Sequence, residues 1–388
     1  MKLRLRYQLV LFTVIRTVFN TMHRMVYPFL GVFARGLGVN ITDLSLALTA
    51  RSIIGTFGPF AATVADQRGR KFGMLLGLGV FTLGVTVVVF WPTLIGLTVA
   101  LIMSTIGKYI FDPGMQAYIG DRVPYERRGR AIAITEFGWS LAFIVGIPVM
   151  GFVISRNGWM APFPLLLLLG TLAFALLYFI LPKDDHRPDP QATVFSNMRL
   201  VLMSLPALAG LSIGLWASAG NEVVNLIFGV WLEDAFALKI AALAGASAVI
   251  GLSELAGEGL VAAFVDRIGK HRAVAVGLIT NSGAALLLSV LGRTPAGALI
   301  GLFLFYISFE FTLVSLIPMM TEVLPEARAT VMAFNVSALS LGRAIGAPLA
   351  PFLYRYGFPV VAVGAVVFNL FALLALRSKI RRQSRDRV

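Results

Sequence analysis

The sequence has no cysteine among its 388 residues and only three histidines. The absence of cysteine excludes disulfides, thiolate metal sites and cysteine nucleophiles. The histidines, His23, His186 and His271, are scattered along the chain and do not form a metal-ligand pattern. No Gly-Lys-Ser/Thr loop that would hold nucleotide phosphates is present. We therefore expect neither an enzyme nor an ATP-driven pump, and no metal or cofactor.

Charged residues are also scarce. They make up 13% of the chain, against roughly 25% in an average soluble domain, whereas 58% of the residues are hydrophobic. Apolar runs of about 20 residues, long enough to cross a bilayer, recur along nearly the whole sequence. The net charge of +14 lies in short segments between these runs and not on a face that could bind a polyanion. We therefore expect the lipid bilayer as a partner, and no nucleic acid.

Turn residues and charges divide the chain into twelve predicted membrane-spanning helices. They cover residues 8–34, 43–65, 73–91, 93–119, 130–155, 160–181, 202–230, 237–264, 272–292, 295–321, 330–354 and 358–377. The longest polar stretch follows the sixth helix. We predict an all-α integral membrane protein in which residues 1–181 form one six-helix bundle, 182–201 a cytoplasmic linker, and 202–388 a second six-helix bundle with a basic cytoplasmic tail.

Lysine and arginine are concentrated in alternate loops, on the same side as the N-terminus. The positive-inside rule places that side, and with it both termini, in the cytoplasm. The start of the chain is similar to a signal peptide, but Arg16 interrupts the apolar run and no small-residue cleavage site follows. We therefore predict a retained first helix in a multi-pass plasma membrane protein, expected in a bacterial inner membrane and as a monomer.

A charged motif occurs twice in this apolar chain. The stretch "VADQRGRKFG" at residues 64–73 is followed by "VDRIGKHR" at 265–272, and Asp66 and Asp266 lie 200 residues apart. Two further landmarks keep nearly the same offset, because Pro124 corresponds to Pro325 and "GIP" at 146–148 corresponds to "GAP" at 346–348. The offset is about half the chain length. It indicates two homologous halves.

These residues resemble the signature of the major facilitator superfamily, Gly-x-x-x-Asp-Arg-x-Gly-Arg-Lys in the loop between helices 2 and 3. The matching residues are Asp66, Gly69, Arg70 and Lys71, the departures are Ala62 and Gln67, and the second half keeps Asp266, Arg267, Gly269 and Lys270. The resemblance covers essentially the full chain. It implies two pseudo-symmetric bundles that work by alternating access. It also implies that this cluster is a gate that latches the cytoplasmic ends of the halves together in one transport state.

Polar residues inside the predicted spans need a cavity or a partner, because an ionisable side chain at membrane depth is costly. The resemblance implies that the first, fourth, seventh and tenth helices line the central cavity, and helical spacing gathers polar residues on these helices. The predicted cavity residues are Arg16, Asn20, His23, Arg24, Tyr27, Lys108, Asp112, Gln116, Glu222, Asn225, Tyr306 and Glu310. For each of them, packing is the alternative to a role in transport.

Residues at matching depth could form ion pairs. A rise of about 1.5 Å per residue brings Arg16 and Asp112 to the same depth across the cavity, and does the same for Glu254 and Arg343 in the second half. We predict a pair for the first two and a structural ion pair for the second two. For Arg51, a snorkelling cation and a functional residue both stay open. His23 is either a proton site or a polar residue whose hydrogen bonds are made within the protein.

The charges suggest how such a protein would work. A substrate with an anionic group could bind Arg16, Arg24 or Lys108, while a buried carboxylate carries a proton. The candidates for that carboxylate are Glu310, Glu258 and Asp112. We therefore predict proton-coupled efflux of an amphipathic or anionic small molecule. The alternatives are uptake or facilitated transport of a hydrophilic solute such as a sugar, lipid translocation, and a receptor or scaffold that no longer transports.

Overall fold

The computed structural model describes residues 3–60, 68–182, 198–324 and 327–385, and within them every regular element is helical. The first half of the chain contains α1 (Leu3–Arg24), α2 (Leu30–Leu37), α3 (Ile41–Thr56), α5 (Arg70–Phe90), α6 (Leu94–Arg122), α7 (Tyr125–Leu141), α8 (Ile147–Asn157) and α9 (Pro162–Ile180). The second half contains α10 (Met198–Met203), α11 (Leu205–Phe236), α12 (Ile240–Ile268), α13 (Lys270–Leu291), α14 (Pro295–Met320), α15 (Arg328–Tyr354) and α16 (Phe358–Arg385). Most of the predicted linker lies outside the described residues.

Most of these helices are long and apolar enough to cross a membrane. Among the described residues ten helices qualify, or eleven if α2 and α3, which meet at 110°, form one span. A bilayer leaves backbone polar groups no water to bind, so helices that satisfy their own backbone are the expected solution. The predicted class, an all-α integral membrane protein, is confirmed. Twelve spans stay a prediction, because α1, which carries Arg16, is not among the helices that are long and apolar enough to cross a membrane.

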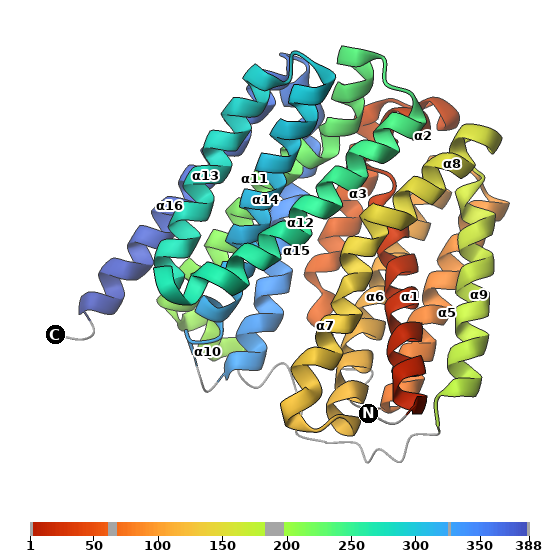
Figure 1. Ribbon diagram of the computed structural model, residues 1–388, viewed down its shortest axis with the longest axis horizontal. Helices are drawn as coiled ribbons and strands as arrows, with labels where there is room; N and C mark the ends of the chain where they lie inside the picture. Colours follow the sequence, from red (N-terminus) through yellow and green to blue (C-terminus); the bar gives the residue numbers. More distant parts are fainter. Residues whose placement is uncertain (1–2, 61–67, 183–197, 325–326, 386–388) are drawn as a thin grey trace.

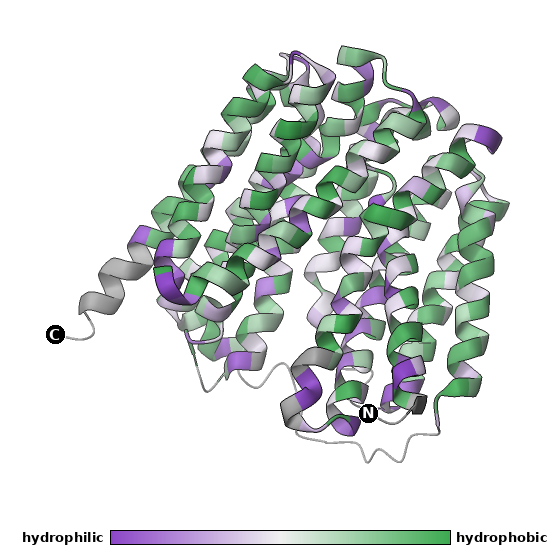
Figure 2. Ribbon diagram, in the orientation of Figure 1, coloured by the Kyte–Doolittle hydropathy of each residue, from purple (hydrophilic) through white to green (hydrophobic). Residues whose placement is uncertain are grey.

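The helices of the two chain halves lie side by side (Figure 1). The first-half helices, α1 to α9, form one group, and the second-half helices, α10 to α16, form the other. Both groups are green over much of their outward faces in Figure 2, whereas purple residues gather at both ends of the helices and at a few interior positions. Apolar side chains therefore face the lipid, and the interior polar residues need partners inside the protein.

Two predicted spans are interrupted. The predicted helix over 8–34 is broken between α1 and α2, where residues 25–29 form turns. The predicted helix over 130–155 continues from α7 into α8 through a π-helical turn, Ala142–Gly146, which ends just before Pro148. Proline cannot donate the backbone hydrogen bond that an α-helix needs at that position, and such a wide turn is one way to accommodate it. Both interruptions lie beside the cavity described below.

The end of the molecule opposite the N-terminus is closed by direct contact between the halves. Gly229 on α11 lies so close to the carbonyl oxygens of Tyr27 and Pro28 that no side chain would fit there. An exposed ion pair between Arg35 and Glu233, with 2.5 Å between nitrogen and oxygen, joins α2 to α11 at the same end. Small residues and complementary charges thus hold the halves together on this side.

Within the first half, α5 and α6 approach each other at a pair of glycines. A Cβ atom added to Gly107 would collide with the carbonyl oxygen of Gly77, and a Cβ added to Gly77 would collide with that of Gly107. Gly283 on α13, by contrast, has open space where a Cβ would lie. Both Gly107 and Gly283 are inside helices, so they form a matched pair for testing this contact.

We predict that Gly107→Ala lowers the melting temperature of the purified protein in detergent, because the added methyl group forces α5 and α6 apart at a cost of about 1–3 kcal/mol. Gly283→Ala should leave the melting temperature unchanged or raise it, because alanine favours a helix by about 1 kcal/mol over glycine. Equal melting temperatures for the two variants would show that the close α5–α6 contact does not contribute to stability.

Candidate functional site

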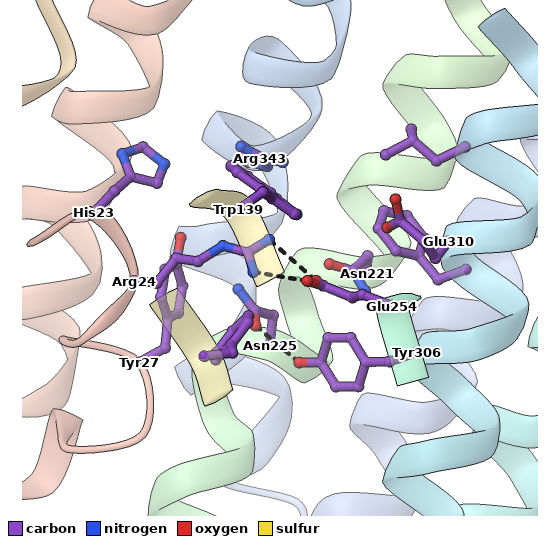
Figure 3. A pocket seen from close by; sticks show the side chains of 13 residues that line it. His23, Arg24, Tyr27, Trp139, Asn221, Asn225, Glu254, Tyr306, Glu310 and Arg343 are labelled. Carbon is purple, nitrogen blue, oxygen red and sulfur yellow. Dashed lines mark hydrogen bonds and ion pairs between the residues drawn. The ribbon is translucent and has the colours of Figure 1, made fainter. Parts of the chain in front are cut away.

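A cavity of about 90 Å³ lies between the two halves of the chain. Figure 3 shows polar side chains from both halves pointing into it. It is lined by His23, Arg24, Tyr27, Trp139, Phe143, Asn221, Asn225, Glu254, Tyr306, Phe309, Glu310, Leu313 and Arg343. Its mixture of aromatic walls and a few convergent polar groups is typical of a small-molecule site.

Arg24 and Glu254 form a bidentate ion pair across this cavity. The two guanidinium nitrogens lie 2.8 and 3.0 Å from the carboxylate oxygens, and both side chains are buried. The guanidinium also covers the rings of Trp139, 3.5 Å from its centroid, and Phe143, 4.2 Å away. The pair joins α1 to α12, and so one half of the chain to the other. Parallel hydrogen bonds of this kind fix the geometry as well as the charge.

The predicted ion pair between Glu254 and Arg343 is wrong. Glu254 pairs with Arg24, and among the described residues Arg343 has no ion pair or hydrogen bond. The physical reason is that depth along a helix does not determine the direction in which a side chain points. Glu254 faces α1 in the other half, whereas Arg343 faces the cavity from α15.

A second polar network links the halves at Tyr27. Its hydroxyl donates to Glu222 Oε1 over 2.8 Å and accepts a hydrogen bond from the Arg51 guanidinium over 2.6 Å. Arg51 is only 1% exposed and also donates to the carbonyl of His23. It is therefore buried and hydrogen-bonded inside the protein and does not snorkel, and its role in transport stays a prediction. On the far side of Glu222, Asn225 donates to the carboxylate and accepts from Tyr306 over 2.8 Å.

Four groups that line the cavity have no partner among the residues that the structure describes. The Glu310 side chain, in a residue only 6% exposed, makes no ion pair or hydrogen bond, and the half-buried Arg343 is equally unpaired. The side-chain nitrogen of Asn221 and Nδ1 of His23 are buried without a hydrogen-bond partner. Buried polar atoms in native proteins are nearly always bonded to protein or water, so these groups make the cavity a candidate binding site.

The sequence matches a family model described as Major Facilitator Superfamily over residues 12–321 and again over 211–387. The chain belongs to the major facilitator superfamily. It is therefore a multi-pass membrane protein of a transporter family, a class that is not enzymatic. The predicted resemblance is confirmed.

Curated relatives span nearly the same length. An uncharacterized MFS-type transporter of Bacillus subtilis, YbcL, is 21% identical over 98% of both chains. The inner membrane transport protein YdhP of Escherichia coli K12 is 25% identical over 90% of both. The multi-drug resistance efflux pump PmrA of Streptococcus pneumoniae is 24% identical over 92% of this chain and 93% of its own.

Solved structures of the superfamily share the fold. A bacterial homolog of the human lysosomal transporter Spinster, in an inward-facing and unoccupied conformation, superimposes with a TM-score of 0.78 at 17% identity over 98% of both chains. A peptide transporter, POT, in complex with sulfate has a TM-score of 0.77 at 15% identity over 96% of this chain and 94% of its own.

The predicted contact between Arg16 and Asp112 is present, but it lies within a larger charged cluster. Arg16 is 3.2 Å from Asp112 and 2.6 Å from Glu136 on α7, which the sequence did not single out. Lys108 is 2.5 Å from the other oxygen of Asp112. Neither Arg16 nor Lys108 lines the cavity. With Arg24 also paired, the three cations predicted to bind an anionic substrate are already neutralised in this transporter by carboxylates.

Other predicted cavity residues are also directed elsewhere. Asn20 is fully buried and donates to the carbonyl of Gly138 on α7, and Gln116 is exposed at a distance from the cavity wall. Glu258, one turn beyond Glu254 on α12, is half-buried and does not line the cavity.

The sequence analysis missed one set of cavity residues, Trp139, Phe143, Asn221, Phe309 and Leu313. Aromatic and aliphatic residues are common throughout the spans, so nothing in the sequence distinguished those on the cavity wall. Asn221 was detectable, because an amide inside a predicted span beside Glu222 is unusual.

The predicted gate motif has the same backbone in both halves. Gly69 precedes α5 with φ of 102°, and Gly269 precedes α13 with φ of 86°. Residues with a side chain rarely adopt positive φ, so glycine is required at both turns. Asp266 and Arg267 are exposed at the end of α12. Asp66 lies outside the described residues.

The basic residues of the motif also repeat their contacts. Arg70 pairs with Asp121 on α6 over 3.4 Å, and Lys270 pairs with Glu322 just beyond α14. Hydrogen bonding by Lys270 lowers the pKa of Glu322, so this pair persists at neutral pH and is lost as the pH falls through that lowered pKa. Lys71 donates to backbone carbonyls at the end of α9. Each of these contacts stays within one half, so the predicted latch between halves stays a prediction.

We predict that Glu254→Gln lowers the melting temperature sharply, because removing one partner leaves Arg24 charged and buried, at a cost of about 3–5 kcal/mol. The double variant Arg24→Gln, Glu254→Gln should recover much of the loss, because no uncompensated charge is left. Thermal unfolding of the single and double variants in detergent measures both effects. If the double variant lost as much melting temperature as Glu254→Gln and Arg24→Gln lose together, the two residues would not form a direct pair.

Proposed function

We propose that this transporter exports amphipathic small molecules in exchange for protons, and that Glu310 carries the proton. The observation that carries the proposal is the environment of Glu310. Its carboxyl group is buried at the wall of the cavity between the halves and makes no ion pair among the described residues. A buried carboxyl group without a cation is most easily accommodated in its neutral, protonated form.

The charged groups around Glu310 fit this role. Glu310 packs against α12 at Gly257, and the same helix carries Glu254 and Glu258. Arg24 and Arg343 line the same cavity as Glu310. Arg24 already has Glu254 as its partner. Its own helix contributes Tyr306, whose hydroxyl is bound to Asn225. Glu310 can therefore exchange a proton without breaking an ion pair.

The other two predicted proton carriers fit less well. Asp112 lies between two cations, Arg16 and Lys108, and protonating it would break both contacts. Glu258 does not line the cavity, so a substrate bound there would not contact it. Glu310 alone among the three candidates combines contact with the cavity and an unpaired carboxyl group.

The direction and the substrate class have separate support. The cavity wall contains Trp139, Phe143, Phe309 and Leu313, which offer an apolar surface for the apolar part of an amphipathic ligand. PmrA, a relative that matches over nearly the whole length, is named a multi-drug resistance efflux pump. We place both termini in the cytoplasm, so export runs from the side of the termini to the opposite side.

Glu310→Gln should abolish pH-driven transport. We predict that proteoliposomes with the unaltered protein accumulate ethidium, an amphipathic fluorescent probe, when a pH gradient is imposed, and that Glu310→Gln liposomes accumulate no more than empty ones. Arg156→Gln, on the exposed end of α8, is the control and should behave like the unaltered protein. Ethidium accumulation by Glu310→Gln at the unaltered rate would refute the proton role of Glu310, and loss in Asp112→Asn with retention in Glu310→Gln would assign it to Asp112.

A further inference from the structure

The cavity contains two unpaired groups of opposite charge. Arg343 reaches it from α15 and Glu310 from α14, and they make no ion pair with each other. Figure 3 shows them apart on the cavity wall. Leaving ionisable groups without partners at membrane depth is costly, and here the half-buried Arg343 and the buried Glu310 both lack partners at one site.

The remaining charges around the cavity are already compensated. Arg24 is neutralised by Glu254 through two hydrogen bonds. The Glu222 carboxylate accepts from Tyr27, which in turn accepts from Arg51, so this carboxylate and this cation share one network. Among the residues that the structure describes, a ligand that enters the cavity therefore meets one free cation, Arg343, and one free carboxyl group, Glu310.

Two uncharged groups at the cavity also lack hydrogen-bond partners among the described residues. Asn221 is 7% exposed, and its side-chain nitrogen has no acceptor. Nδ1 of His23 is buried and unpaired as well. A ligand that formed hydrogen bonds with these two atoms would remove the free-energy cost of burying them without partners.

We propose that the cavity recognises zwitterionic amphiphiles, with the anionic group of the ligand on Arg343 and its cationic group on Glu310. The apolar part would lie on Phe143, Phe309 and Leu313. A molecule with only one charge satisfies one of the two groups and leaves the other buried and unpaired. The proposal rests on the proposed function in one respect, because the cationic group of the ligand competes with the proton for Glu310.

Four ligands with an alkyl chain of seven or eight carbons test the charge requirement. They are N-octyl-N,N-dimethylglycine, which is a zwitterion, octyltrimethylammonium, octanoate and octanol. Binding is measured by titration calorimetry on the protein in lipid nanodiscs at pH 8. We expect the zwitterion to bind at least about tenfold more tightly than any of the other three, because hydrogen bonds to charged groups are worth about tenfold or more in affinity.

Variants assign each end of the ligand. Arg343→Gln should lower the affinity for the zwitterion and for octanoate and leave that for octyltrimethylammonium unchanged. Glu310→Gln should lower the affinity for the zwitterion and for octyltrimethylammonium only. Arg343→Lys retains the charge and should recover part of the affinity, which separates lost recognition from misfolding. Arg156→Gln is the control for the removal of an arginine far from the cavity.

Equal affinities for the zwitterion and octyltrimethylammonium, with no effect of Arg343→Gln, would overturn the proposal in favour of a simple cation site. Equal affinities for the zwitterion and octanoate, with no effect of Glu310→Gln, would overturn it in favour of an anion site. The outcome is independent of proton coupling. The expected binding pattern without pH-driven flux would refute the proposed function alone, and pH-driven ethidium flux without the pattern would refute this inference alone.

Discussion

An arginine buried between the two halves of a membrane protein needs a counter-charge, and Arg24 finds it in Glu254 on the opposite half. The other features of the site depend on this pair. It removes two charges from the cavity, places a guanidinium over Trp139 and Phe143, and joins α1 to α12. Because the pair is complete in itself, the charges left facing the cavity, Arg343 and Glu310, are available for a ligand and a proton.

In the mechanism that we propose, the same pattern couples substrate binding to proton binding with few residues. Paired charges such as Arg24 and Glu254 hold the two halves together, whereas unpaired groups can bind a substrate or a proton. Glu310 can be satisfied by a proton or by a cationic group of a substrate, and only one of the two fits at a time. Under our proposal, such a cavity would link substrate release to proton binding through competition at one carboxyl group.

The sequence predicted the helical membrane fold, the superfamily and the repeat of the gate motif. Hydropathy and the 200-residue offset between Asp66 and Asp266 can be read from the order of residues alone, without knowing how the helices pack. It also predicted the contact between Arg16 and Asp112, whose depths match. It failed for Glu254, which pairs with Arg24 instead of Arg343. Helical spacing gives relative direction within one helix, but the rotation of one helix against another is set by packing between the halves, which no single-sequence pattern contains.

The central claim is that substrate and proton compete for Glu310. The most direct test is to add N-octyl-N,N-dimethylglycine to the purified protein in weakly buffered solution and to follow released protons with a pH-sensitive dye. The account predicts up to about one proton released for each ligand bound when Glu310 is protonated beforehand, and none from Glu310→Gln. Saturating binding to the unaltered protein at low pH without any proton release would contradict it.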